Sequence, residues 1–283
     1  EITTALLEDF KKPVFETYIT EISVVLSELD LMIKNIASWS KPEKIRPALM
    51  NFPSTEYIYN EPYGNCLIIA PWNYPFQLAM APLIDAIATG NTVILKPSEL
   101  TPKTSALLKR IVSEVFQPEH AVVVEGDAGV ASKLLVLKWD YIFFTGSVKV
   151  GKIVAKAAAP HLTPVTLELG GKNPNIIFAD CDYDDMLNTT VRSSFANQGQ
   201  ICLCGSRIFV EESIYDKFKA DFVEKVKGLK VGHPSEIDTN IGALVSKPHL
   251  EKVKSYIEIA KEEGATILCG GNEVTVEGYE NGY

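Results

Sequence analysis

The first part of the chain carries a helical pattern of apolar residues. The positions that recur at three- and four-residue spacing are Val25, Leu29, Met32, Ile33 and Ile36. This spacing predicts helix from about residue 2 to residue 36. Pro13 interrupts the pattern, and we expect a break there because proline lacks the N–H that a helix needs. A proline-bearing connection follows from Pro42 to Tyr63, in which Glu56–Asn60 fits a strand.

From Cys66 onward, short apolar runs alternate with helical patterns. The predicted strands are Cys66–Ala70, Thr92–Leu95, Ala121–Val124, Tyr141–Phe144 and Val165–Leu169. The predicted helices between them are Phe76–Thr89, Thr101–Phe116, Ala128–Leu135 and Ser147–Ala159. Apolar strands that alternate with helices indicate a parallel sheet with helices on both faces. The pattern therefore predicts an α/β fold with a Rossmann-like, doubly wound parallel sheet.

A second alternation begins after Gly170-Gly171. Its predicted strands are Asn175–Phe178, Arg207–Val210 and Thr266–Cys269, and its predicted helices are Tyr183–Asn197, Ile214–Lys227 and Leu250–Lys261. We expect a cofactor domain over residues 1–167 and a second, catalytic α/β domain over residues 168–283. The chain starts without methionine inside a helical pattern and stops at Tyr283 without a closing element. We therefore expect a piece of a larger protein, with the second domain incomplete.

Composition narrows the possible functions. The 283 residues carry a net charge of −9, which argues against a nucleic-acid surface. No apolar run approaches the roughly 18 residues that a membrane span requires. The five cysteines are odd in number and irregularly spaced, which indicates reduced thiols and a cytoplasmic location. No histidine lies at ligand spacing from Cys202 and Cys204, so we expect no metal site.

Three residues could carry covalent chemistry. Cys202 could act as a nucleophile that holds an acyl group as a thioester, or it could be a small buried apolar residue, with Cys204 as a competing thiol. Glu168 ends an apolar strand and could act as a general base in a cleft, or be a solvated strand-end carboxylate. Asn73 follows a strand and could donate to an oxyanion, or serve as a turn residue before Tyr74.

Other polar residues follow predicted strands at the sheet edge where such folds bind ligands. Lys96 and Glu99 could bind ribose hydroxyls, or be two solvated loop charges. Gly146-Ser147 opens a helix whose first amides could bind phosphate, or it is an ordinary helix start. Gly146 and Gly151 do not form the G-x-G-x-x-G pattern, so the usual dinucleotide fingerprint is absent.

Taken together, these segments and their order resemble the aldehyde dehydrogenase superfamily. The matching stretches are PWNYP at 71–75, LKPSE at 95–99, FFTGS at 143–147 with Gly151, LELGGKNP at 167–174 and GQIC at 199–202. The last two are highly specific, and the stretches span most of the chain. The family uses a Rossmann-like domain without the usual glycine fingerprint, in agreement with its absence here.

The resemblance implies a role for each candidate residue. Cys202 matches the nucleophile and Glu168 the general base, while Asn73 and the Cys202 backbone N–H match the oxyanion donors. The cofactor positions are Lys96 and Glu99 for ribose, Gly146, Ser147 and Gly151 for pyrophosphate, and Trp72 lining the cofactor cleft. The implied reaction is NAD- or NADP-dependent oxidation of a small-molecule aldehyde to a carboxylic acid, through a thiohemiacetal and a thioester. The full-length parent is expected to be a homodimer or homotetramer.

Two departures from the family affect these expectations. The family motif Glu-x-Phe-Gly-Pro, which holds the nicotinamide ribose, is missing, so we expect little turnover from residues 1–283 alone. The stretch through Leu167 resembles the class 3 branch, whereas the stretch from Asn173 resembles the tetrameric classes, so a composite sequence is one hypothesis. Two alternative functions stay open: a CoA-acylating aldehyde dehydrogenase and a catalytically dead dinucleotide-binding fragment.

Overall fold

The computed structural model describes residues 1–234, 236, 238–280 and 282–283. These residues form two compact units. The sheet unit comprises Tyr18–Glu168 with Ile2, and the second unit comprises Leu169–Tyr283 with Glu1 and Thr3–Thr17. The sequence-based division into domains 1–167 and 168–283 stays a prediction, because a compact unit is not by itself an independently folding domain.

The sheet unit is built on five strands in the spatial order β5-β4-β3-β6-β7. Their bounds are β3 Asn65–Ile69, β4 Thr92–Lys96, β5 Ala121–Val123, β6 Tyr141–Gly146 and β7 Val165–Leu169. Strand β3 pairs in parallel with β4 and with β6, so that Leu67 lies opposite both Ile94 and Ile142. The chain adds β4 and β5 on one side of β3 and then returns to add β6 on the other. The predicted doubly wound parallel sheet is confirmed, and the strand order reverses between β3 and β6.

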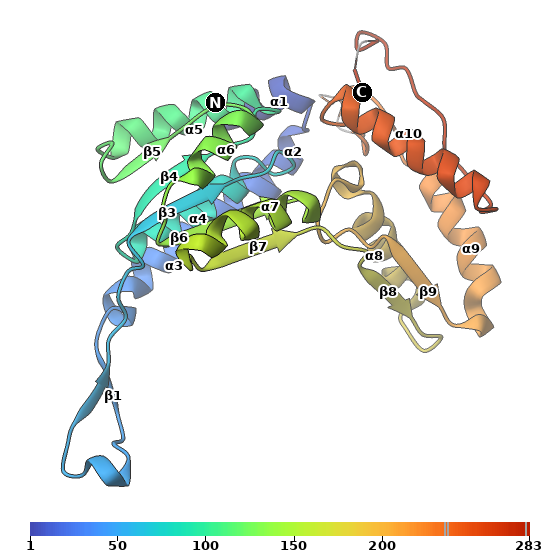
Figure 1. The fold of residues 1–283 in the computed structure, drawn as a ribbon. Helices are drawn as coiled ribbons and strands as arrows, with labels where there is room; N and C mark the ends of the chain where they lie inside the picture. Colours follow the sequence, from blue (N-terminus) through green and yellow to red (C-terminus); the bar gives the residue numbers. More distant parts are fainter. Residues whose placement is uncertain (235, 237, 281) are drawn as a thin grey trace. The chain divides into compact units, whose positions relative to one another are not determined.

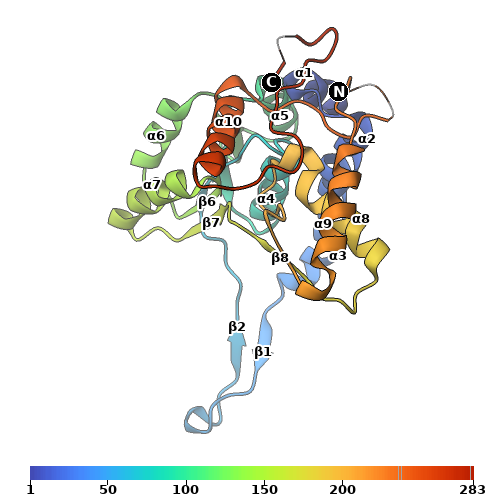
Figure 2. The ribbon, with the colours of Figure 1, turned by 90° about the vertical axis from the view of Figure 1, so that its right-hand side faces the viewer.

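Helices cover both faces of this sheet. Figure 2 shows α6 and α7 on one face and α4 and α5 on the other. Their bounds are α4 Gln77–Ala88, α5 Pro102–Val115, α6 Ala128–Val136 and α7 Val148–Ala158. Strand β3 is apolar on both faces as a result: Cys66 and Ile68 join the core beneath α4, and Leu67 is also fully buried. Within the described ranges, no helix combines the length and the apolar content that crossing a membrane requires.

The segments before the sheet follow the predicted pattern, with more breaks. Helix α1 covers Ile2–Phe10, α2 Val14–Thr17, the π-helix η1 Tyr18–Ile22 and α3 Ser23–Trp39. The predicted break at Pro13 is confirmed. Strand β2, Glu56–Ile58, pairs antiparallel with β1, Glu43–Ile45, and a short 3-10 helix, η2, lies between them at Leu49–Asn51. Strands β1 and β2 and the short helix η2 form a narrow arm that projects from the sheet unit (Figure 1).

The second unit contains a smaller α/β arrangement. Strand β8, Pro174–Ile177, pairs in parallel with β9, Arg207–Val210. Besides α1 and α2, this unit contains the helices α8 Tyr183–Phe195, α9 Glu212–Lys227 and α10 Lys247–Glu262. Ile177, Leu187 and Phe218 form the buried centre between β8, α8 and α9.

One predicted strand is wrong. Residues Thr266–Cys269 form no strand, and none of the strands in the described ranges pairs with them. Ile267 is 40% exposed and Leu268 is 51% exposed. The apolar run has the composition of a strand but lacks a neighbouring backbone to complete its hydrogen bonds, and pairing rather than composition creates a strand.

Candidate active site

Cys202 lies in an irregular, exposed segment between the 3-10 helix η4, Ala196–Gly199, and strand β9. The backbone before it is strained. Asn197 has φ 48° and Gln198 has φ 57°, both in the left-handed region that costs a non-glycine residue about 1–2 kcal/mol. Such conformations persist only where the surroundings fix them, and they concentrate at functional sites.

The side chain of Gln200 fixes this turn from within. Its Oε1 accepts a hydrogen bond from the backbone N–H of Val245 at 3.1 Å, and its Nε2 donates to the carbonyl oxygen of Asn197 at 3.3 Å. Gln200 is buried, with 6% of its surface exposed. A buried amide therefore joins the strained turn to the segment before α10, and Cys202 follows two residues later.

The two neighbouring thiols have different environments. The Cys204 Sγ donates to the carbonyl oxygen of Ser194 at 3.3 Å and is partly buried. Burial raises the pKa of the Cys204 thiol, and the nearby charge of Lys172 opposes this only in part. Cys202 is exposed. Because only a thiolate is a good nucleophile, Cys204 is suited to a structural role and Cys202 is the accessible thiol.

The other two predicted catalytic residues belong to the sheet unit. Glu168 lies in β7 and is exposed, and Asn73 lies half-buried in the segment between β3 and α4. Cys202 belongs to the second unit. The meeting of these three side chains in one site therefore stays a prediction.

A buried carboxylate determines where α4 begins, just after Asn73. The Glu21 Oε2 accepts hydrogen bonds from the backbone N–H groups of Phe76 at 3.0 Å and Gln77 at 2.9 Å. Glu21 is fully buried, at 0% exposure. The first amides of a helix have no partner within the helix, and a carboxylate supplies one with favourable charge. The segment that carries Trp72 and Asn73 is thus bounded by β3 on one side and by this anchored helix start on the other.

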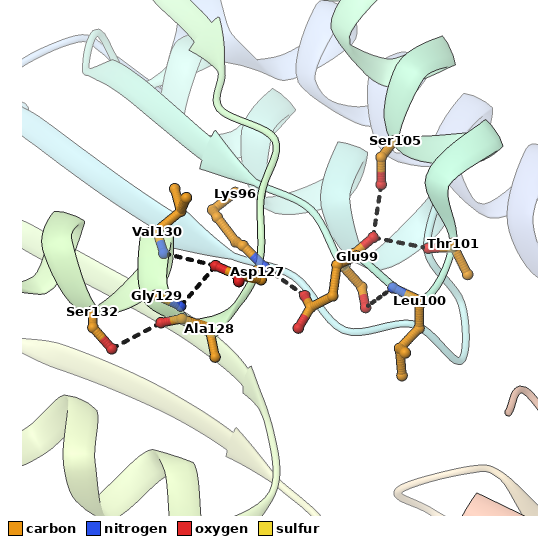
Figure 3. Close-up of polar contacts among 11 residues, drawn as sticks. Lys96, Glu99, Leu100, Thr101, Ser105, Asp127, Ala128, Gly129, Val130 and Ser132 are labelled. Carbon is orange, nitrogen blue, oxygen red and sulfur yellow. Dashed lines mark hydrogen bonds and ion pairs between the residues drawn. The ribbon is translucent and has the colours of Figure 1, made fainter. Parts of the chain in front are cut away.

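Lys96 and Glu99 form an ion pair at the carboxyl end of β4. The Lys96 Nζ lies 2.7 Å from the Glu99 Oε2, with the lysine side chain 5% exposed and the glutamate side chain 42% exposed (Figure 3). A buried ammonium requires such a partner. The loop between them is fixed by the Ser105 hydroxyl, which donates to the carbonyl oxygen of Ser98 at 2.8 Å. The two charges are held in place and are not freely solvated.

Gly146 and Ser147 mark the passage from β6 to α7. The Ser147 Oγ accepts from the N–H of Val150 at 3.3 Å, which makes Ser147 the N-cap of α7. A Cβ on Gly146 would lie 2.5 Å from the ring of Phe144, so any larger residue there would require that ring to move. Gly151 is buried near the start of the same helix.

The predicted cofactor residues thus follow β3, β4 and β6. These three strands are parallel neighbours, so their carboxyl ends lie at one edge of the sheet. The half-buried Trp72 follows β3, Lys96 and Glu99 end or follow β4, and Ser147 follows β6. The structure brings the predicted cofactor residues to the edge where doubly wound sheets bind ligands.

Asp127 and Asn173 are among the residues whose contacts the sequence analysis did not identify. Asp127 caps α6, with its Oδ1 accepting from the N–H groups of Gly129 at 2.9 Å and Val130 at 3.2 Å (Figure 3). An aspartate directly before a predicted helix is a recognisable signal of an N-cap. Asn173 contacts the Cys202 segment, and no local pattern signals it because the contact joins segments far apart in the sequence.

The sheet order and the polar groups at its carboxyl edge define an α/β protein of the Rossmann-like type. Sequence comparison then assigns the family: the sequence model of the aldehyde dehydrogenase family matches residues 1–283. The chain belongs to the aldehyde dehydrogenase family.

Relatives agree with this assignment. The chain is 42% identical over 255 residues to 4,4'-diapolycopene-4,4'-dial dehydrogenase of Cytobacillus firmus, covering 90% of this chain and 56% of the relative. It is 48% identical over 217 residues to 2-aminomuconic semialdehyde dehydrogenase of Bos taurus, covering 76% and 45%. The crystal structure of betaine aldehyde dehydrogenase from Staphylococcus aureus with NAD+ superimposes with a TM-score of 0.86 at 34% identity, covering 96% of this chain and 55% of that one. The chain spans about half the length of the curated relatives it matches.

Proposed function

We propose that this chain carries the cofactor-binding and thiol chemistry of an NAD- or NADP-dependent aldehyde dehydrogenase, which oxidises an aldehyde to a carboxylic acid. The observation that carries the proposal is the contrast between the two thiols after the strained turn. Cys204 donates to a backbone carbonyl and has a raised pKa, whereas Cys202 is exposed. Family membership supports the same reaction class.

In this proposal, Cys202 attacks the aldehyde and forms a carbon–sulfur bond, and the former carbonyl oxygen becomes an oxyanion. The Asn73 side-chain amide and the Cys202 backbone N–H donate to that oxygen. A bound nicotinamide would supply the hydride acceptor for this oxidation, so that the adduct on Cys202 would become a thioester. Glu168 then takes a proton from a water molecule, the water oxygen attacks the thioester carbon, and the acid departs as the Cys202 thiolate is restored.

The residues at the sheet edge suit a dinucleotide. Lys96 and Glu99 would hold ribose hydroxyls, with the lysine donating and the carboxylate accepting. The first amides of α7, beside Ser147, would hold the pyrophosphate, because a helix N-terminus attracts anions. The NAD+ complex of the S. aureus betaine aldehyde dehydrogenase supports the choice of cofactor. The Glu99 carboxylate favours NAD, because it would repel a 2′-phosphate.

We further propose that the whole protein is a homodimer or homotetramer. The tip of the β1–β2 arm exposes large apolar side chains: Leu49 is 92% exposed, Met50 is 96% exposed and Phe52 is 78% exposed. A cluster of apolar residues on a projecting arm favours burial against another subunit.

The central test traps the covalent intermediate. The chain is mixed with an aldehyde and NAD+, quenched in acid and digested, and the acyl mass is assigned to a peptide. We expect the adduct on Cys202, its loss in Cys202→Ala and its retention in the matched control Cys204→Ala. An adduct that survives Cys202→Ala would refute the assignment of the nucleophile.

The same experiment separates the alternatives. Binding of NAD+ without any adduct would favour the catalytically dead fragment. Release of the adduct by added CoA faster than by water would favour the CoA-acylating enzyme, since a thiol would then replace water as the acceptor. In the full-length protein we expect release by water, with Glu168→Gln slowing it and leaving adduct formation intact.

A further inference from the structure

We propose that Asn173 is a positioning residue for the Cys202 thiol. The Asn173 Nδ2 donates to the carbonyl oxygen of Cys202 at 2.7 Å and lies 3.3 Å from the carbonyl oxygen of Cys204. One side-chain amide thus contacts the backbone carbonyl groups of both neighbours of Leu203, namely Cys202 and Cys204. The inference rests on the proposed role of Cys202 as the nucleophile.

The backbone of Asn173 is fixed independently of its side chain. Its carbonyl oxygen accepts from the N–H of Arg207 at 3.2 Å, at the point where β8 and β9 begin to pair. The side-chain amide of Asn173 therefore extends from backbone that is fixed at the end of the β8–β9 pair. A donor carried by a strand end has little freedom of its own, so it can hold the position of the segment that it contacts.

The Cys202 segment needs such a contact because it belongs to no helix or strand. Around Cys202 itself, the segment turns back where the N–H of Cys204 donates to the carbonyl oxygen of Ile201 at 3.1 Å. A hydrogen bond to the Cys202 carbonyl fixes the peptide plane that follows Cys202, and hence the direction in which its side chain leaves the backbone. A misplacement of about 1 Å at a reacting atom can cost on the order of a hundredfold in rate.

The place of Asn173 in the chain adds to this argument. It lies in the same motif as Glu168, LELGGKNP at 167–174. The stretch that contains the proposed general base therefore also contains a residue that contacts the backbone of the proposed nucleophile. The contact with Cys202 gives the asparagine of the motif a physical role. Its position directly before strand β8 does not by itself suggest that role.

The test compares two reactions of Cys202 in the 283-residue chain. Acylation by p-nitrophenyl acetate requires an aligned thiol, whereas alkylation by iodoacetamide requires only an accessible thiolate. The variant Asn173→Asp keeps the side-chain volume but replaces the donor by an acceptor. We expect Asn173→Asp to lower the acylation rate constant of Cys202 about tenfold. The alkylation rate constant, compared at a pH high enough for thiols to be fully ionised, should stay within about twofold of the wild type, because the accessibility of the thiol is unchanged.

A matched control lies two residues further along the chain, in β8. The Asn175 Nδ2 donates to the Thr190 Oγ1 at 3.2 Å, so Asn175→Ala also removes a strand-borne amide from a half-buried site. We expect Asn175→Ala to leave the acylation-to-alkylation ratio unchanged. A fall in this ratio in both variants, or in neither, would overturn the positioning role. If Asn173→Asp does not fold, Asn173→Ser replaces it, and the same ratio decides.

Amide hydrogen exchange distinguishes this inference from the proposed function. Loss of the contact should speed exchange at the N–H groups of Leu203 and Cys204 about tenfold in Asn173→Asp, whether or not the chain performs catalysis. Faster exchange with no acylation of the wild type would support the backbone contact and refute the proposed nucleophile. Normal acylation in both proteins with unchanged exchange would leave the proposed function intact and refute the role of Asn173.

Discussion

Replacing Glu21 by alanine removes the carboxylate that anchors the start of α4. Two backbone N–H groups, those of Phe76 and Gln77, then lose their acceptor in a buried site. Each orphaned donor costs about 1–3 kcal/mol, and the lost attraction between the carboxylate and the helix dipole costs up to about 2 kcal/mol. Removing the charge also removes its own desolvation cost, which offsets part of this loss. We expect a net fall in the free energy of unfolding of about 3–5 kcal/mol.

Two further variants refine this expectation. Glu21→Gln keeps the volume and one acceptor oxygen but loses the charge, so we expect a fall of about 1–2 kcal/mol. Asp30→Ala is the control, because Asp30 on α3 is 70% exposed and lies 3.8 Å from the Lys34 ammonium. Such an exposed pair contributes less than about 0.5 kcal/mol.

Urea unfolding followed by tryptophan fluorescence measures these differences, and amide exchange locates them. In Glu21→Gln we expect faster exchange at Asn73, Phe76 and Gln77, because the helix start and the segment before it lose a common anchor. The margin for a real difference is about 0.5 kcal/mol, roughly the contribution of one surface ion pair. If the free energies of unfolding of Glu21→Ala and Asp30→Ala differ by less than this margin, the Glu21 carboxylate does not anchor α4 and the reasoning fails.

Three further predictions concern the sheet unit. Burial and the nearby Glu28 raise the pKa of Asp85 from 3.8 to about 6. The folded state therefore retains a proton that the unfolded state releases. The free energy of unfolding consequently falls as the pH rises from about 4 to about 6. Asp85→Asn should abolish this fall and raise the free energy of unfolding at pH 7 by about 1 kcal/mol after allowance for solvent screening, as measured by thermal melts across that range. Lys96→Met should weaken NAD+ binding at least about tenfold by calorimetry, because the proposed ribose site loses its charged donor. Asp127→Ala should lower the free energy of unfolding by about 0.5–2 kcal/mol through the loss of the α6 cap, and an unchanged urea midpoint would contradict it.

The sequence was sufficient to predict the sheet and the residues at its edge. Buried parallel strands are apolar throughout and short, so β3, β4, β5, β6 and β7 stand out between helical patterns. Once the strands are placed, the topology rule locates Lys96, Glu99 and Ser147 at one edge without any coordinates. The same reasoning failed at Thr266–Cys269, since an apolar run shows that a strand is possible but not that a partner exists.

The sequence was not sufficient to predict the contacts that hold the reactive segments. Glu21 lies inside a helical pattern, and Asn173 precedes a strand, so each has an ordinary local explanation. Their contacts with Phe76 and with Cys202 join segments far apart in the chain. Gln200 was visible only as part of a motif, and its hydrogen bond to Val245 was not. Local periodicity contains no information on which distant backbone group lacks a partner.

These three side chains share a physical reason for their position. Segments outside helices and strands leave backbone N–H and C=O groups without regular partners, and burial of such groups is costly. A carboxylate can accept two N–H groups, as Glu21 does, and an amide can contact two carbonyls, as Asn173 does. Reactive groups belong on irregular segments because those segments can approach a substrate. It follows that acids and amides from neighbouring elements must supply the order that regular hydrogen bonding does not, and that their substitution should loosen the segments that carry Asn73 and Cys202.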